Sequence, residues 1–272
     1  MHWDQRGAGK SFNKTIPVES MTIDRFVEDC RELIDYLRRR FHQDKVFLVA
    51  HSSGSVIGLK TAHRYPEKLH AYIGVAQIVH ELAQQQLAYD FLVEEATKAG
   101  DTSRLKAIQA IGPPPYDSPQ QFFKVAGHIG HYGGFLQDNS LKMPLKVVLV
   151  MLNFITSPEY SLAEGLRTFR NKGLHFTMNA QWEEMKNVDL IEEIQAIDVP
   201  LYFFEGKYDM TTATVLVEDF FDKLTAEKGK KLIIFEHSGH LPMMEEKERY
   251  EERLLAVLRE NLSNSSQKRA DR

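Results

Sequence analysis

Small side chains lie two residues before and two residues after a serine in the run Ala50-His51-Ser52-Ser53-Gly54. The run is close to the Gly-x-Ser-x-Gly pattern of a nucleophile elbow, in which a serine occupies a sharp turn between a strand and a helix. The start of that helix packs against the end of the strand, and alanine is small enough to replace the first glycine. The run predicts Ser52 as a nucleophile and the Ser53 N–H as an oxyanion donor, with a plain helix N-cap as the alternative for Ser52.

An acid and a base that could activate this serine follow it in the order Asp, His, which is the chain order of esterase-type triads. Asp209 ends Gly206-Lys207-Tyr208-Asp209, directly after an apolar run, and His240 ends Ser238-Gly239-His240, directly after another. In an open parallel sheet, chemistry gathers beyond the carboxyl ends of the strands. We therefore expect Ser52 to attack, His240 to take its proton and Asp209 to orient the imidazole.

Other acids and bases near these positions fit the roles less well. Glu205 lies in the strand body, where a buried carboxylate is costly unless it is paired. His237 lies nearer the strand end than the predicted base, and His51 is expected to point away from the nucleophile and to support it indirectly. Asp189 and Asp198 precede the third strand and so lie at its other end.

The elements that must position these residues alternate between short apolar runs and amphipathic helices. Apolar side chains recur at three- and four-residue steps over residues 22–41, which predicts a helix with Thr22 as its N-cap. Continuous apolar runs predict strands buried on both faces of a parallel sheet. These runs are residues 46–50, 71–76, 201–204 and 232–235, and a charged amphipathic helix follows them over residues 245–262. The alternation predicts an α/β fold.

The region from residue 77 to residue 198 has no strand pattern of this kind. Its helical patterns are interrupted by glycine and proline, for example at Gly112-Pro113-Pro114-Pro115. A long helical insertion between two strands predicts a cap. We expect a first core part over residues 1–76, the cap over 77–198, a second core part over 199–262 and a flexible tail over 263–272.

Composition excludes several classes of protein. The chain has 272 residues, of which 43% are hydrophobic, and this excludes a disordered chain. A net charge of −4 disfavours nucleic acid as a partner. The longest apolar stretch, residues 145–155, is shorter than the about 20 residues of a membrane helix. With no signal-peptide pattern at the N-terminus, we expect a cytoplasmic protein that does not enter a membrane.

The sequence predicts no metal and no cofactor. The single cysteine, Cys30, can form neither an internal disulfide nor a thiolate metal site. The run Gly7-Ala8-Gly9-Lys10-Ser11 ends like a phosphate-binding loop, but Asp4 occupies the position where that motif needs glycine.

Together with the elbow, the segment Trp3-Asp4-Gln5-Arg6-Gly7-Ala8-Gly9-Lys10-Ser11 resembles the proline iminopeptidase (prolyl aminopeptidase) group of α/β-hydrolases. The Gly-x-x-Asp and Ser-Gly-His elements extend the resemblance, which covers roughly residues 1–76 and 199–260. It implies the α/β-hydrolase fold, a mainly parallel sheet with flanking helices and an inserted helical cap. It also implies a serine hydrolase that cleaves an amide or ester bond of a small molecule or peptide through an acyl-enzyme. A carboxylesterase with the same triad is the alternative.

In that group, acidic residues of the cap hold the free amino terminus of the substrate. The candidates here are Glu159, Glu164, Glu183 and Glu184, and Trp182 could form a pocket wall. No local motif selects among them, and each is also explained by a solvated helix face or, for Trp182, by a core position.

The resemblance further implies strands and a His-Gly-Gly loop ahead of Trp3, and that loop supplies a second oxyanion donor. The sequence begins at Met1, so we expect a weak hydrolase or an impaired scaffold, with an exposed sheet edge that favours self-association. The run His131-Tyr132-Gly133-Gly134 looks like a substitute for this loop, but it lies in the predicted cap.

Overall fold

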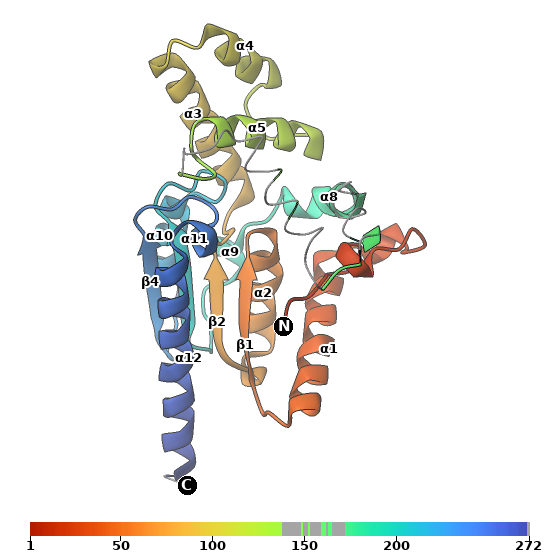
Figure 1. Ribbon diagram of the computed structural model, residues 1–272, viewed down its shortest axis with the longest axis vertical. Helices are drawn as coiled ribbons and strands as arrows, with labels where there is room; N and C mark the ends of the chain where they lie inside the picture. The colour runs from red at the N-terminus through yellow and green to blue at the C-terminus, as the bar shows by residue number, and fades with distance from the viewer. Residues whose placement is uncertain (138–147, 149–151, 153–158, 162, 165–171, 271–272) are drawn as a thin grey trace.

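The computed structural model describes residues 1–137, 148, 152, 159–161, 163–164 and 172–270. In this part of the chain a parallel sheet has the strand order β1-β2-β3-β4. The strands are β1 (Val46–His51), β2 (Leu69–Val75), β3 (Leu201–Gly206) and β4 (Lys230–Phe235), which confirms the four predicted strands. Because they run parallel, their carboxyl ends meet at one edge of the sheet, toward the top of Figure 1.

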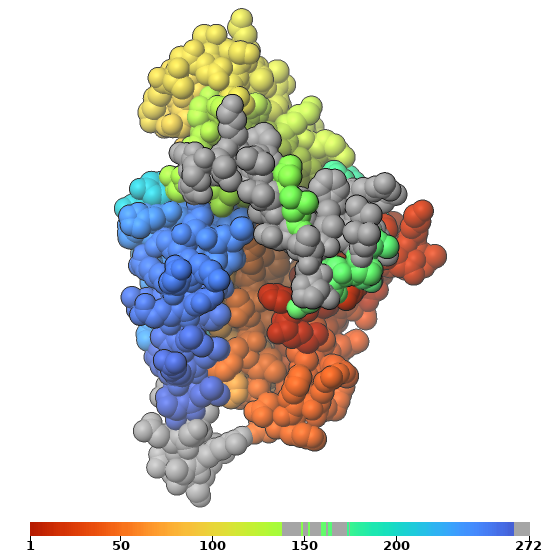
Figure 2. Space-filling model, in the orientation of Figure 1, coloured from red at the N-terminus to blue at the C-terminus, as the bar shows by residue number. Residues whose placement is uncertain are grey.

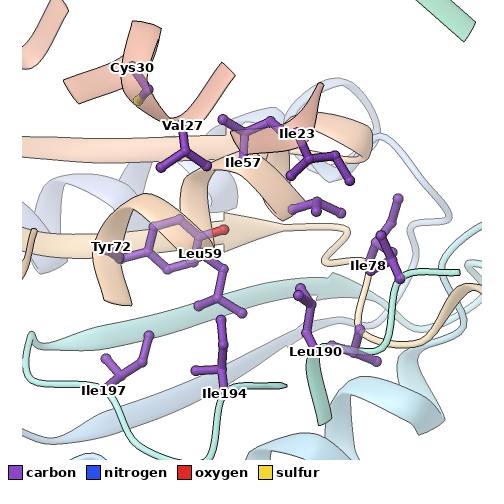
Figure 3. Close-up of a cluster of buried hydrophobic side chains, with 14 of the residues drawn as sticks. Ile23, Val27, Cys30, Ile57, Leu59, Tyr72, Ile78, Leu190, Ile194 and Ile197 are labelled. Atoms are coloured by element: carbon purple, nitrogen blue, oxygen red, sulfur yellow. The ribbon is translucent and has the colours of Figure 1, made fainter. Parts of the chain in front are cut away.

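Helices cover both faces of the sheet. One face packs against α1 (Ile23–Phe41), α2 (Ser53–Arg64) and α10 (Thr214–Lys223), and the other packs against α12 (Lys247–Ala270). Figure 3 shows the first layer, where Val27 of α1, Leu59 of α2 and Tyr72 of β2 lie in one apolar cluster. The predicted α/β architecture is therefore confirmed.

The first helix forms as its sequence predicts. The Thr22 side chain accepts a hydrogen bond from the backbone N–H of Arg25 at 3.2 Å, which caps the helix. The apolar stripe, which includes Phe26 and Cys30, is buried against the sheet. Burial raises the pKa of the Cys30 thiol to about 11, so this cysteine packs as a small hydrophobe.

Burial of β1 differs from the prediction. Its residues are only partly buried, and Val49 is 43% exposed. The reason is position: among the described strands β1 lies at the edge of the sheet and pairs with β2. A groove of about 610 Å³ runs along it, lined by residues of α1, β1 and α12 and by Met1, His2 and Trp3. Figure 2 shows this hollow between α12, in blue, and α1, in orange.

Five described helices lie between β2 and β3 in the chain, and the first four of them lie beyond the carboxyl ends of the strands (Figure 1), whereas the fifth packs into the apolar cluster of α1 and α2. They are α3 (Glu81–Lys98), α4 (Thr102–Ile111), α5 (Pro119–His131), α8 (Lys172–Met185) and α9 (Leu190–Glu193). Four of these helices, α3, α4, α5 and α8, contribute to a separate apolar cluster that includes Leu92, Ile108, Val125 and Trp182.

The C-terminal helices also differ in extent from the prediction. After α11 (Pro242–Glu245), α12 continues to Ala270 rather than ending near Leu262. Gln, Lys, Arg and Ala, the residues at 267–270, have sufficient intrinsic helix propensity to continue the helix. Neither α12 nor any other helix in the described residues has the length and apolar character to span a bilayer.

Candidate active site

Ser52 occupies the turn that joins β1 to α2. Its backbone has φ 54° and ψ −128°, a region that side-chain-bearing residues rarely adopt. The turn is held to the sheet by the Ser52 N–H, which donates to the carbonyl oxygen of Val75 at 3.0 Å. Strained backbone of this kind persists only where its surroundings determine it, and it is common at active sites.

Small residues around the turn let α2 pack closely on the sheet. A Cβ atom at Gly58 would lie 2.5 Å from the Ala50 Cβ and 2.8 Å from the Tyr72 ring. Neither neighbour belongs to a flexible side-chain end, so glycine is required at residue 58. Ala50 can fill the place of the first glycine of the pattern because the residue that faces its Cβ across this contact is itself a glycine.

His240 is buried and lies in the loop after β4, at the same end of the sheet as Ser52. Its Nε2 atom lies 2.8 Å from the Ser52 Oγ, and its Nδ1 atom lies 2.7 Å from Asp209 Oδ2. With Nδ1–H donating to the carboxylate, Nε2 is free to accept the serine hydroxyl proton.

Asp209 lies in the loop after β3 and is 1% exposed. Its Oδ1 accepts the backbone N–H groups of Thr211 and Thr212 at 2.7 and 2.9 Å. Its Oδ2 accepts the Thr212 hydroxyl at 2.6 Å as well as the His240 N–H. These donors compensate the burial of a carboxylate and fix its orientation.

The loops that carry Asp209 and His240 approach each other through their backbones. A Cβ atom at Gly206 would lie 1.8 Å from the Gly239 carbonyl oxygen. No side chain fits in that space, so the glycine of Gly-x-x-Asp is the residue that lets the two loops meet.

Comparisons with known proteins show which proteins this chain is similar to. The model of the family described as serine aminopeptidase, S33, matches residues 1–109. A crystal structure of proline iminopeptidase from Mycobacterium smegmatis is similar with a TM-score of 0.65 at 15% identity, over 97% of this chain and 80% of that one. The chain has the α/β-hydrolase fold.

Two relatives of this chain match it over most of its length. The probable aminopeptidase YbaC of Bacillus subtilis (strain 168) is 29% identical over 250 residues, which are 90% of this chain and 75% of the relative. The proline iminopeptidase of Saccharolobus solfataricus is 27% identical over 256 residues, 92% of this chain and 72% of the relative. The predicted family resemblance is thereby confirmed.

The other acids and bases that the sequence offered for these roles lie outside the hydrogen-bonded group of Ser52, His240 and Asp209. His237 is exposed. Glu205 is buried at the end of β3 and accepts the Gln77 N–H at 3.1 Å, and burial raises its pKa well above the usual range. Asp189 caps α9 with its side chain, and Asp198 forms an ion pair with Lys228.

Each of the four acidic candidates in the helical region either contacts another group of the chain or is exposed to solvent. Glu184 accepts the N–H of Ile23 at 2.6 Å, at the start of α1. Glu183 is exposed and pairs with Lys186. Glu164 accepts the backbone N–H of Ser161, and Glu159 is exposed.

Trp182 of α8 is buried against Phe122, with ring centroids 5.9 Å apart. It therefore belongs to the apolar cluster of the helices beyond the sheet.

The sequence did not single out several residues that hold the site together. Thr212, three residues after Asp209, supplies two of the four donors to that carboxylate. The Thr211 N–H, two residues after Asp209, donates to the same carboxylate with the spacing of an Asx turn, a local signal that could have identified this loop. Among the described residues, no three His, Cys, Asp or Glu side chains are grouped to hold a metal ion.

Proposed function

We propose that this α/β-hydrolase cleaves an amide or ester bond through an acyl-enzyme, with Ser52, His240 and Asp209 as its catalytic triad. The observation that carries the proposal is the continuous hydrogen-bond chain from Ser52 Oγ through the His240 ring to Asp209, with links of 2.8 and 2.7 Å. A nucleophile, a base and an orienting acid within these distances are the signature of an activated serine.

In the first half of the reaction, Ser52 Oγ attacks the substrate carbonyl carbon while its proton passes to His240 Nε2. Asp209 stabilises the resulting imidazolium and keeps the ring in the productive tautomer. The imidazolium then protonates the leaving amine or alcohol, which departs as the acyl-enzyme forms. Water, activated by the same imidazole, releases the acid and regenerates Ser52.

The oxyanion of the tetrahedral intermediate is proposed to bind the Ser53 N–H. Ser53 is the first residue of α2, where backbone N–H groups have no acceptor within their own helix. The positive end of the helix dipole adds to this stabilisation. One such donor contributes about a hundred- to a thousandfold in turnover.

We propose an aminopeptidase of the proline iminopeptidase type as the specific activity. The support is that the curated relatives named aminopeptidase and proline iminopeptidase match 90% and 92% of this chain, through both core parts and the helices between them. Helices α3, α4, α5 and α8 lie over the strand ends near Ser52 and His240, so these four helices are positioned to select the substrate.

The nucleophile is tested with a fluorophosphonate probe, which reacts with activated serines. The wild-type chain should be labelled and Ser52→Ala should not. Ser53→Ala is the matched control, because it removes a neighbouring hydroxyl but keeps the backbone N–H. Labelling that persists in Ser52→Ala would exclude Ser52 as the nucleophile.

The substrate class is tested with paired chromogenic substrates that share one leaving group. Proline and alanine 4-nitroanilides with a free amino group should be cleaved, and their N-acetylated forms should not. Cleavage of simple acyl esters alone would favour a carboxylesterase and contradict the aminopeptidase.

A further inference from the structure

We propose that residues 133–137, the segment after α5, together with Glu245, position the catalytic loops from the side opposite the nucleophile elbow. This inference rests on the proposed triad. It gives a role to Gly134, the second glycine of the His131-Tyr132-Gly133-Gly134 run. In this proposal the run does not form an oxyanion loop, and Gly134 belongs to a clamp on the loops of His240 and Asp209. We call residues 133–137 the clamp segment.

The clamp segment holds the loop of the catalytic base through its backbone. The His240 N–H donates to the Phe135 carbonyl oxygen at 2.7 Å. A Cβ atom at Gly239 would lie 2.6 Å from that same oxygen, so the glycine before His240 permits this approach. The Phe135 and His240 rings lie 5.3 Å apart between centroids, at an angle of 32°.

The same segment holds the loop of the catalytic acid. The Met210 N–H, one residue after Asp209, donates to the Gly134 carbonyl oxygen at 2.8 Å. A Cβ atom at Gly134 would lie 2.8 Å from the Met210 Cβ, so a larger residue would push this loop away. Two consecutive carbonyl groups of one segment thus bind the two loops whose side chains form the Asp209–His240 pair.

Glu245 ties the clamp segment to the base loop a second time. Its Oε1 accepts the Gln137 N–H at 2.5 Å, and its Oε2 accepts the Gly239 N–H at 2.7 Å. One carboxylate therefore bridges the two backbones, and hydrogen bonds to a charged acceptor are about twice as strong as neutral ones. In Figure 1 the short helix α11, which ends at Glu245, lies below α5 at the strand ends.

The clamp connects the helices beyond the sheet to the chemistry. Ser52 is held by β1 and β2, whereas the loops of His240 and Asp209 are held by the clamp segment. The clamp segment is in turn attached to α5, because the Gly134 N–H donates to the Ile129 carbonyl oxygen at 3.0 Å. A shift of the clamp would move the acid and the base together relative to the nucleophile. A misplacement of 1 Å can cost about a hundredfold in rate.

The test is Glu245→Gln, which keeps the side chain's shape but leaves one acceptor oxygen for two N–H groups. We expect kcat to fall roughly 10- to 100-fold and KM to stay within about twofold, because the geometry of the base changes and the substrate contacts do not. Glu248→Gln removes an exposed carboxylate from α12 and is the charge-matched control, expected to keep the wild-type kcat.

Titration of active serines with fluorophosphonate normalises each kcat to folded sites, so a loss of stability cannot imitate the effect. A normalised kcat for Glu245→Gln equal to that of wild type would overturn the clamp, whatever its melting temperature. Gly134→Ala, which pushes on Met210 from the clamp side, should lower normalised kcat in the same way, and an unchanged value would overturn it too. Failure of the proposed function is distinguishable, because wild type itself would then not be labelled at Ser52.

Discussion

The Nε2 atom of His51 lies 3.0 Å from the backbone carbonyl oxygen of His240, to which it donates, and the two imidazole rings are 4.9 Å apart. The residue before the nucleophile thus supports the residue that activates it, as the sequence suggested for His51. Burial, and then the proximity of His240, lowers the pKa of His51 to about 4. His51 is therefore neutral in mildly acid and neutral solution and adds no positive charge beside the base.

This relationship predicts how two His51 variants differ in activity. His51→Gln can still donate to the His240 carbonyl oxygen, so its kcat should stay within about threefold of wild type. His51→Phe loses the donor and should reduce kcat roughly tenfold, the order of one lost hydrogen bond.

The measurement is kcat for wild type and both variants on one substrate at one pH. A His51→Phe variant with the kcat of wild type would contradict the support that this hydrogen bond gives to His240.

Asp209→Asn tests the role of the buried acid. The amide oxygen can still accept the backbone N–H groups of Thr211 and Thr212, so the loop should keep its shape. The imidazole, however, loses the acceptor that selects its tautomer, and we expect kcat to fall about 10⁴-fold with little change in KM. Asp219→Asn, which removes an exposed partner of Lys223 on α10, is the control. A loss smaller than about tenfold, relative to this control, would contradict the assignment.

The placement of Ser52, Asp209 and His240 was predictable because each follows an apolar run by a few residues. Parallel strands bring their carboxyl ends to one edge, so positions far apart in the chain converge there without further information. A local sequence signal was informative as well. Gly206, the glycine of the Gly-x-x-Asp element, is the residue that allows the close contact with Gly239.

The residues that hold these loops were not predictable in the same way. The clamp segment has no periodicity, and its hydrogen bonds to Met210 and His240 come from backbone carbonyl oxygens, which every residue type carries. Glu184 likewise carries no signal of its contact with the Ile23 N–H, because the two lie in separate elements. The apolar run of β1 predicts burial but cannot tell a central strand from one at an edge.

The β1 edge leads to a prediction about association. The sequence predicts self-association through an exposed edge, and Val49 is 43% exposed on the edge strand of the described sheet. A lysine on an edge strand opposes pairing with a second copy. Val49→Lys should therefore shift the chain toward monomer, as measured by light scattering after size exclusion, whereas Val215→Lys on α10 should not. A wild-type chain that is monomeric at every concentration would contradict the prediction.

Glu81 leads to a prediction about stability and pH. This residue of α3 is 5% exposed, and burial raises its pKa to about 7, against an ordinary value of 4.5, although Gln85 donates to it. The folded chain keeps the carboxyl protonated in a range where the unfolded chain has released the proton. Its contribution to the free energy of unfolding therefore decreases from about pH 4.5 to pH 7, by up to about 1.4 kcal/mol per pH unit.

Glu81→Gln removes this dependence because the amide is neutral at every pH. Relative to wild type, the variant should be similar in stability near about pH 4.5 and more stable by up to about 3 kcal/mol at about pH 8. Urea denaturation over that range measures the difference, in which the effect of a further buried carboxyl, that of Glu205, cancels. Glu94→Gln removes an exposed partner of Lys98 on the same helix and should change stability by less than about 1 kcal/mol. If the difference between Glu81→Gln and wild type does not grow with pH, Glu81 is ionised in the folded chain and its burial is compensated by contacts beyond Gln85.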